Sequence, residues 1–277
     1  MLRSLLVGVN GSQWSQVACE IAIRWARDLK IPLTCLGVCE SGPPSSIESV
    51  PLSQTDMAAA CDIGLSAMQR AKIKRALRDA GQHAAAAGIS CHIIEVEGNP
   101  ATLLGEEAQR HDLIILGRRA CPHPSQGAAP SETLTEILRY SPRPIVLAGQ
   151  EIPRSSHVIV AYDGSAQASR TLQSFVSSGL YYGHPLHLVG VGNSPNDVNR
   201  SLSRAVDYLN AHSLRAETHV LPIEVDVSQT LIDFARQTPT GLLVMGVYGQ
   251  PWYKELLFGS VTRAVLAQFP APLFLNH

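Results

Sequence analysis

The sequence predicts an α/β protein with two tandem, doubly wound (Rossmann-like) domains, each with a five-stranded parallel sheet covered by helices on both faces. The first observation is an internal repeat. The segment LLVGVNGS at residues 5–12 recurs as VIVAYDGS at residues 158–165, and DLIILG, which ends at Gly117, recurs as GLLVMG, which ends at Gly246. The second observation is that, within each copy, apolar runs of strand length alternate with segments of helical period. The chain should therefore fold as two copies of one unit.

We expect the first domain to span residues 1–149 and the second to span residues 156–277. The segment AGQEIPRSSH at residues 148–157 lies between them and has the polar, proline-containing composition of a linker. The first copy is the longer one because it carries an insertion. We assign this insertion to the serine- and proline-rich stretch at residues 41–56 and expect it to be a surface loop.

The elements of the second copy follow in a regular order. Strands are expected at residues 158–161, 186–191, 217–221 and 242–245 and at the closing PLFLN. Between them the sequence predicts four helices. The first has Leu172, Phe175, Val176 and Leu180 at helical spacing, the second is opened by Ser194 and Pro195, the third starts near Ser228 and the fourth is opened by Ser260. The first copy follows the same order and has a long, alanine-rich helix at about residues 62–87, which Gly88 should end.

Composition limits the partners of the chain. The formal net charge is −1, with 45% hydrophobic and 16% charged residues, so no overall field attracts nucleic acid or an anionic membrane. The longest apolar runs are far shorter than the roughly 20 residues that cross a bilayer, and the first residues are too few for a signal-peptide core. We therefore expect a cytoplasmic protein with neither nucleic acid nor membrane as a partner.

The cysteines and histidines do not form a recognisable metal motif. All six cysteines lie in the first half, without a Cys-x-x-Cys pair or a zinc-site spacing, and are interpreted as buried small apolar residues. A redox-sensing thiol, or half a metal site at Cys121 and His123, is the alternative. His184 precedes the strand predicted at residues 186–191 and His187 lies near its start; both are interpreted as structural or exposed. We therefore predict no metal site.

A glycine-containing segment follows the predicted strand at residues 242–245. It reads GVYGQPWYKELLFGS, so that Gly246, Gly249 and Gly259 precede Ser260 and the last predicted helix. Glycines let a backbone approach a phosphate closely, and the free N–H groups and dipole at a helix start attract negative charge. The segment therefore predicts a phosphate site. The alternative is that the glycines only shape a turn and Ser260 only caps its helix. Neither a Walker loop nor a dinucleotide fingerprint is present.

This spacing, the strand-end Asp163-Gly164-Ser165 and the Pro270-Ala271-Pro272 before the last strand resemble the ATP-binding members of the universal stress protein family. The whole chain resembles a tandem of two such domains. The resemblance implies five parallel strands in each domain and ATP or a related adenine nucleotide as ligand, with or without Mg²⁺. It also implies dimers built through the last strand, so we expect the chain to self-associate or to mimic such a dimer within itself.

The resemblance also assigns site residues. It implies that Asp163 and Val191 face the adenosine. It implies that the phosphates and ribose are held by the glycine segment, namely by Gly246, Gly249, Gly259 and Ser260.

The first copy keeps the spacing and loses the residues that the phosphate site needs. Ala120 and Pro130 stand where the second copy has Gly249 and Gly259, and Asn10 stands where it has Asp163. Proline lacks the N–H that a phosphate would need, and alanine disfavours left-handed conformations. We therefore predict that the first domain binds no nucleotide. The alternative is that Arg118 and Arg119 attract another anion there.

No catalytic residue is predicted. Hydrolysis needs a positioned water, a base and usually a metal, and Asp163 is the one obvious carboxylate near the second site. We therefore expect at most a weak ATPase. The sequence predicts a universal stress protein that binds an adenine nucleotide through its second domain, with the first domain serving structure or partner contact in a stress response. The alternatives are a nucleotide-free tandem scaffold and a slow ATP hydrolase.

Overall fold

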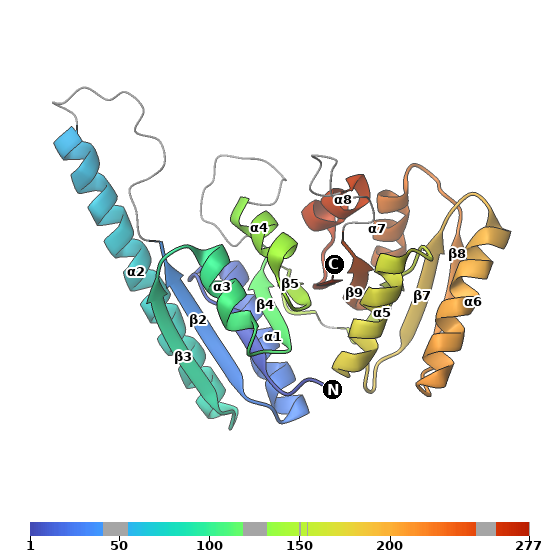
Figure 1. Ribbon diagram of the computed structural model, residues 1–277, viewed down its shortest axis with the longest axis horizontal. Coiled ribbons are helices and arrows are strands. Elements are labelled where there is room, and N and C mark those ends of the chain that lie inside the picture. Colours follow the sequence, from blue (N-terminus) through green and yellow to red (C-terminus); the bar gives the residue numbers. More distant parts are fainter. Residues whose placement is uncertain (41–54, 119–131, 150, 154, 248–258, 277) are drawn as a thin grey trace.

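The strands of both halves lie in one sheet (Figure 1). The computed structural model describes residues 1–40, 55–118, 132–149, 151–153, 155–247 and 259–276, and of residues 55–66 and 132 it describes the backbone alone. Within these ranges the sheet has ten strands in the order β3-β2-β1-β4-β5-β10-β9-β6-β7-β8.

Each half of the sheet has the doubly wound order expected of a Rossmann-like unit. The strands of the first half are β1 (Leu5–Gly8), β2 (Leu33–Cys39), β3 (Cys91–Glu97), β4 (Leu113–Gly117) and β5 (Ile145–Ala148). Those of the second half are β6 (His157–Ala161), β7 (Leu186–Val191), β8 (Glu217–Leu221), β9 (Thr240–Gly246) and β10 (Leu273–Asn276). All pairs within a half are parallel. This confirms the predicted fold class.

Helices cover both faces of the sheet (Figure 1). One face is covered by α1 (Gln13–Leu29), α2 (Thr55–Ala86), α5 (Ala166–Ser178) and α6 (Pro195–Ala211). The other is covered by α3 (Pro100–Ala108), α4 (Glu132–Tyr140), α7 (Val227–Gln237) and α8 (Ser260–Gln268). None of these helices, as far as the chain is described, is long and apolar enough to span a membrane. The strands are therefore buried on both sides, which accounts for their continuous apolar runs.

The ends of the helices follow local signals, with two differences from the sequence-based expectation. Gly88, at φ +73°, follows the end of α2 as expected. However, α2 begins at Thr55, so the last two residues of the predicted insertion are helical and the others lie outside the described residues. Ser194 takes the N-cap position of α6 but makes no side-chain capping bond. Pro195 suits the first turn of α6, because the N–H that proline lacks would have no intrahelical partner at this position.

The described cysteines fit the expected role of small buried residues. Cys19, Cys35 and Cys39 are buried free thiols, and Cys91 is half-buried. Burial raises the pKa of the Cys19 thiol to about 12. Cys61 and Cys121 lie outside the residues whose side chains are described.

The two halves meet through their last strands. β5 and β10 pair antiparallel, with Leu147 opposite Leu273, Val146 opposite Phe274 and Ile145 opposite Leu275. All six residues are at most 2% exposed. The sheet and the two apolar layers beside it therefore run across the junction without a break.

Arg118, at the end of β4, connects the two halves through hydrogen bonds. Its Nη2 donates a hydrogen bond of 2.6 Å to the carbonyl of Ala271, and its Nη1 donates to the carbonyl of Phe269. The side chain is buried, and burial lowers the pKa of this guanidinium to about 10. The guanidinium of Arg118 thus binds carbonyl groups of the second half. It is therefore not available to attract an anion to the first domain. Arg119 lies outside the described residues.

We predict that Gly149→Ala lowers the free energy of unfolding by about 1–3 kcal/mol. A Cβ at this position would lie 2.5 Å from the carbonyl oxygen of Pro270 in the other half, and a backbone atom cannot move aside cheaply. The measurement is the midpoint of urea unfolding followed by far-UV circular dichroism. Gly105→Ala, within α3, is the matched control. Its Cβ meets open space, so it should stabilise the protein by about 0.5–1 kcal/mol. Equal midpoints for both variants would contradict the predicted clash.

Candidate functional site

The carboxyl ends of β6, β7 and β9 meet at the point where the strand order of the second half reverses. From β6 the chain continues to β7 on one side, and β9 later pairs with β6 on the other side. Ligands of open parallel sheets bind beyond the strand ends at such a reversal. The register pairs Val160 with Val244, so two residues further along Tyr162 and Gly246 come to neighbouring positions. Asp163 follows directly.

A tight turn fixes Asp163 at the end of β6. Its Oδ1 accepts a hydrogen bond of 2.9 Å from the N–H of Ser165, and the Ser165 hydroxyl accepts one of 3.1 Å from the N–H of Ala168, which caps α5. Gly164 has φ +80°, and a Cβ there would lie 2.6 Å from Oγ of Ser201 on α6. Glycine is required at this turn by both its conformation and the close helix. The exposed Asp163 carboxylate is therefore held in place.

The end of β7 lies close under α6. Val191 is the last residue of β7 and is half-buried. The next residue, Gly192, donates its N–H to the carbonyl of Leu221 at 3.0 Å. A Cβ on Gly190 would lie 2.5 Å from Cγ1 of Val198, so the helix can approach the strand only because this residue is glycine. The backbone at Val191 is thus positioned firmly at the edge of the sheet.

Gly246 has a packing role at the end of β9. A Cβ there would lie 3.0 Å from Cγ of Gln167 on α5. Gln167 is buried, and its Nε2 donates a 2.8 Å hydrogen bond to the carbonyl of Asn276 on β10. Gln167 was not among the residues singled out from the sequence. The sequence signal that could have indicated its role is a polar residue on the side of the helix that packs against the sheet, where a buried polar group needs a hydrogen-bond partner.

The start of α8 has no side-chain cap. Gly259 is the N-cap residue, with φ −60° and ψ 156°, and no side chain of the described residues accepts a hydrogen bond in its place. Both Gly259 and Ser260 are exposed, and a Cβ on Gly259 would meet nothing within 4 Å. The first turn of a helix has N–H groups without intrahelical partners, and glycine offers them no acceptor. This end of α8 can therefore receive an anion.

The topology brings this helix start to the same edge as the strand ends. Because α8 connects the parallel neighbours β9 and β10, it must run back across the sheet, and its first residues lie at the carboxyl end of β9. The sheet thus gathers Asp163, Val191 and Gly246 at one edge, and α8 adds Gly259 and Ser260. Gly249 lies outside the described residues.

The first half repeats the turn with a neutral residue. Oδ1 of Asn10 accepts from the N–H of Ser12 at 3.0 Å and from its hydroxyl at 2.7 Å, and Gly11 has φ +74°. Beyond the strand ends lies a cavity of about 50 Å³, whose walls include Asn10, Glu40 and Gln69. Such a volume has room for a few water molecules. Ala120 and Pro130 lie outside the described residues.

Comparisons with known proteins agree in family and in fold. The model of the universal stress protein family matches residues 1–148 and again residues 155–275. The universal stress protein Slr1230 of Synechocystis is 25% identical and is aligned over 98% of this chain and 99% of its own length.

Two solved structures are similar along their whole length. A universal stress protein from Archaeoglobus fulgidus has a TM-score of 0.73 at 18% identity, over 98% of this chain and 97% of its own. The functionally unknown protein PA1789 of Pseudomonas aeruginosa has a TM-score of 0.66 at 16% identity, over 99% and 92%. At these sequence identities, the two structures support the assignment of the fold and nothing more.

We predict that Asp163→Ala destabilises the protein by about 0.5–1.5 kcal/mol, because the N–H of Ser165 loses its acceptor. Asp163→Asn should leave the free energy of unfolding within about 0.5 kcal/mol of the original, since Asn10 makes the same bond in the first half. Urea unfolding of the two variants measures this. If Asp163→Asn were as damaging as Asp163→Ala, the carboxylate charge rather than the turn would be what stabilises this strand end.

Proposed function

The chain belongs to the universal stress protein family, and from this premise we propose that its second half binds ATP or a related adenine nucleotide. The observation that carries the proposal is the start of α8 at the carboxyl edge of the second half, where no side chain of the described residues caps the helix. The N–H groups of a first helical turn without a side-chain cap are favourable partners for a phosphate group.

The described residues fit such a ligand. The N–H groups of the first turn of α8, at Gly259 and Ser260, would receive the phosphates, and glycine at the cap keeps the approach open. Asp163 and Val191, at the ends of β6 and β7, are proposed to face the adenosine. Gly246 is proposed to take part in the phosphate segment, as is Gly249, which lies outside the described residues. A charge-assisted hydrogen bond contributes about 1.5–3 kcal/mol, so a few of them suffice to hold a nucleotide. Mg²⁺, where it accompanies ATP, would neutralise part of the phosphate charge.

The proposal gives the first half a structural or partner-binding part in a stress response. Its strand-end turn has the neutral Asn10 in place of Asp163, and its last strand is paired with β10. We propose that this pairing reproduces, within one chain, the interface of a dimer joined through the last strands of its two subunits. Self-association of chains and a cytoplasmic location also stay predictions.

Rapid hydrolysis is not part of the proposal. Oδ1 of Asp163 accepts a backbone hydrogen bond and so serves the turn, which disfavours a role as the base that orients water. We therefore expect ATP turnover to be weak at most.

We predict that Ser260→Asp affects stability and nucleotide binding in opposite directions. A carboxylate in the first turn of α8 should raise the free energy of unfolding by about 0.3–1 kcal/mol through the helix dipole. The same charge should weaken ATP binding by about tenfold or more, because like charges about 4 Å apart repel by about 1–4 kcal/mol in this setting. Urea unfolding and isothermal titration calorimetry measure the two effects. Ser260→Asn is the matched neutral control and should weaken ATP binding less than Ser260→Asp does, because it adds no negative charge.

The titration of the unchanged protein decides among the alternatives. One ATP per chain, with affinity lost in Ser260→Asp and kept in Asn10→Ala, would support a single site in the second half. Two equal sites, or equal affinity in the Ser260 variants, would refute the assignment. No heat and no thermal shift at millimolar ATP would favour the nucleotide-free scaffold. Phosphate release with Mg²⁺, abolished by Ser260→Asp, would favour the slow hydrolase.

A further inference from the structure

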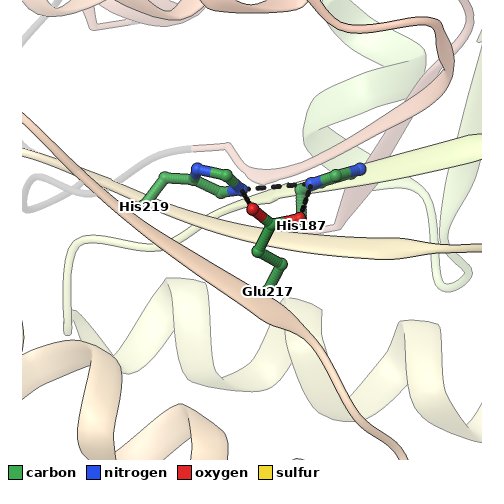
Figure 2. A group of neighbouring side chains, drawn as sticks. All are labelled: His187, Glu217 and His219. Atoms are coloured by element: carbon green, nitrogen blue, oxygen red, sulfur yellow. Dashed lines mark hydrogen bonds and ion pairs between the residues drawn. The ribbon is translucent and has the colours of Figure 1, made fainter.

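Three metal-ligating side chains come together on β7 and β8, away from the carboxyl edge. Figure 2 shows His187, Glu217 and His219, with one dashed line from each imidazole to the carboxylate and one between the imidazoles. Glu217 and His219 are alternate residues of β8, and the parallel register places Glu217 opposite His187. All three therefore project from the same face of the sheet, near the amino ends of these strands.

The separations of the ligand atoms match those around a tetrahedral cation. Nδ1 of His187 lies 3.1 Å from Nε2 of His219, and the Glu217 carboxylate oxygens lie 3.6 Å and 3.8 Å from these two nitrogens. A zinc centre with bonds of about 2.0–2.1 Å holds neighbouring ligand atoms about 3.3 Å apart. Both oxygen distances exceed a normal hydrogen bond, so the carboxylate lies within ion-pair distance of both imidazoles without a hydrogen bond to either.

The neighbouring residues favour the form of His187 that binds metal. Its Nε2 lies 2.9 Å from Nδ1 of His157, and a hydrogen bond donated from Nε2 leaves Nδ1 without a proton, so that Nδ1 accepts the 3.1 Å hydrogen bond from Nε2 of His219. A cation between these two nitrogens would replace that bond and displace its proton. Metal binds an unprotonated imidazole nitrogen, and a hydrogen bond donated from the other ring nitrogen fixes the orientation of the ring.

The group is accessible from one side. His187 is buried, and the ring of His219 packs 4.8 Å from the ring of Phe234 on α7. The Glu217 side chain is 69% exposed. A cation can thus enter past the carboxylate, and three protein ligands leave its fourth position to water.

The fold itself does not demand these residues. With Leu5 aligned to Val158, the strand registers place Thr34, His92 and Ile94 of the first half where the second half has His187, Glu217 and His219. These equivalent positions of the first half pack in the same architecture without a cluster of two histidines and a carboxylate. Packing alone therefore does not account for His187, Glu217 and His219.

We propose that His187, Glu217 and His219 bind a divalent transition-metal cation, with Zn²⁺ as the best match. Two imidazole nitrogens and one carboxylate suit zinc, copper or nickel, whereas Mg²⁺ and Ca²⁺ require oxygen ligands. His157 positions His187 from behind. The proposal replaces the sequence interpretation of His187 as a structural or exposed residue.

The test is calorimetric titration of the full chain, treated with chelator and free of nucleotide, with Zn²⁺ alone. We expect Glu217→Gln and His219→Gln each to weaken binding at one site by about tenfold or more, since loss of even an outer partner costs about 10–100-fold. His212→Gln, which removes an exposed imidazole at the end of α6, is the matched control and should bind as the original does. His157→Phe should weaken binding less than the ligand variants.

Two further measurements distinguish a cation at this group from zinc bound elsewhere on the chain. Co²⁺ in place of Zn²⁺ should give the intense visible absorption of a tetrahedral site, and Glu217→Gln should reduce it. Zn²⁺ should raise the melting temperature of the original protein and raise that of Glu217→Gln clearly less at the same concentration. Glu217 is exposed, so its variant should fold normally. Unchanged Zn²⁺ affinity in both ligand variants would overturn the proposal and assign any binding to cysteines or other histidines.

Discussion

The antiparallel pairing of β5 with β10 is the constraint on which the rest of the molecule depends. In each half the last strand would otherwise be an open sheet edge with unpaired N–H and C=O groups and two apolar faces. Pairing satisfies both edges at once and joins the apolar layers of the halves. Arg118 adds donors for carbonyls of the opposite half, and the small Gly149 allows the backbones to approach. The outer edges of the sheet are left to β3 and β8.

Much of the fold was predictable because its strands are buried on both faces. Such strands appear in the sequence as short, continuous apolar runs, and a repeat of these runs predicted two units before any site was considered. The join between the units was beyond local pattern, since nothing in the apolar runs themselves says that Leu147 lies opposite Leu273. The start of α2 at Thr55 was missed because serine and proline signal a loop in any short window.

The site was predictable where one short segment determines it. Asp163, Gly164 and Ser165 form a turn whose bonds span two or three residues, so sequence alone indicates their geometry. The role of Arg118 was not predictable, because its partners lie more than 150 residues away. The histidine group needs the register between β7 and β8. Its one local signal is the alternation of Glu217 and His219, which also occurs on strands without metal.

The two proposed sites of the second half share β7, and this gives them a physical link. Val191 and His187 lie four residues apart on the same face of the strand, about 13 Å at 3.3 Å per residue. A dication at the amino end and a polyanion beyond the carboxyl end would attract one another across the strand. Water would screen this attraction at a Debye length of about 8 Å, but a field that runs through the buried sheet is screened less. If both ligands bind, each should therefore strengthen the other modestly, and by linkage the two effects must be equal.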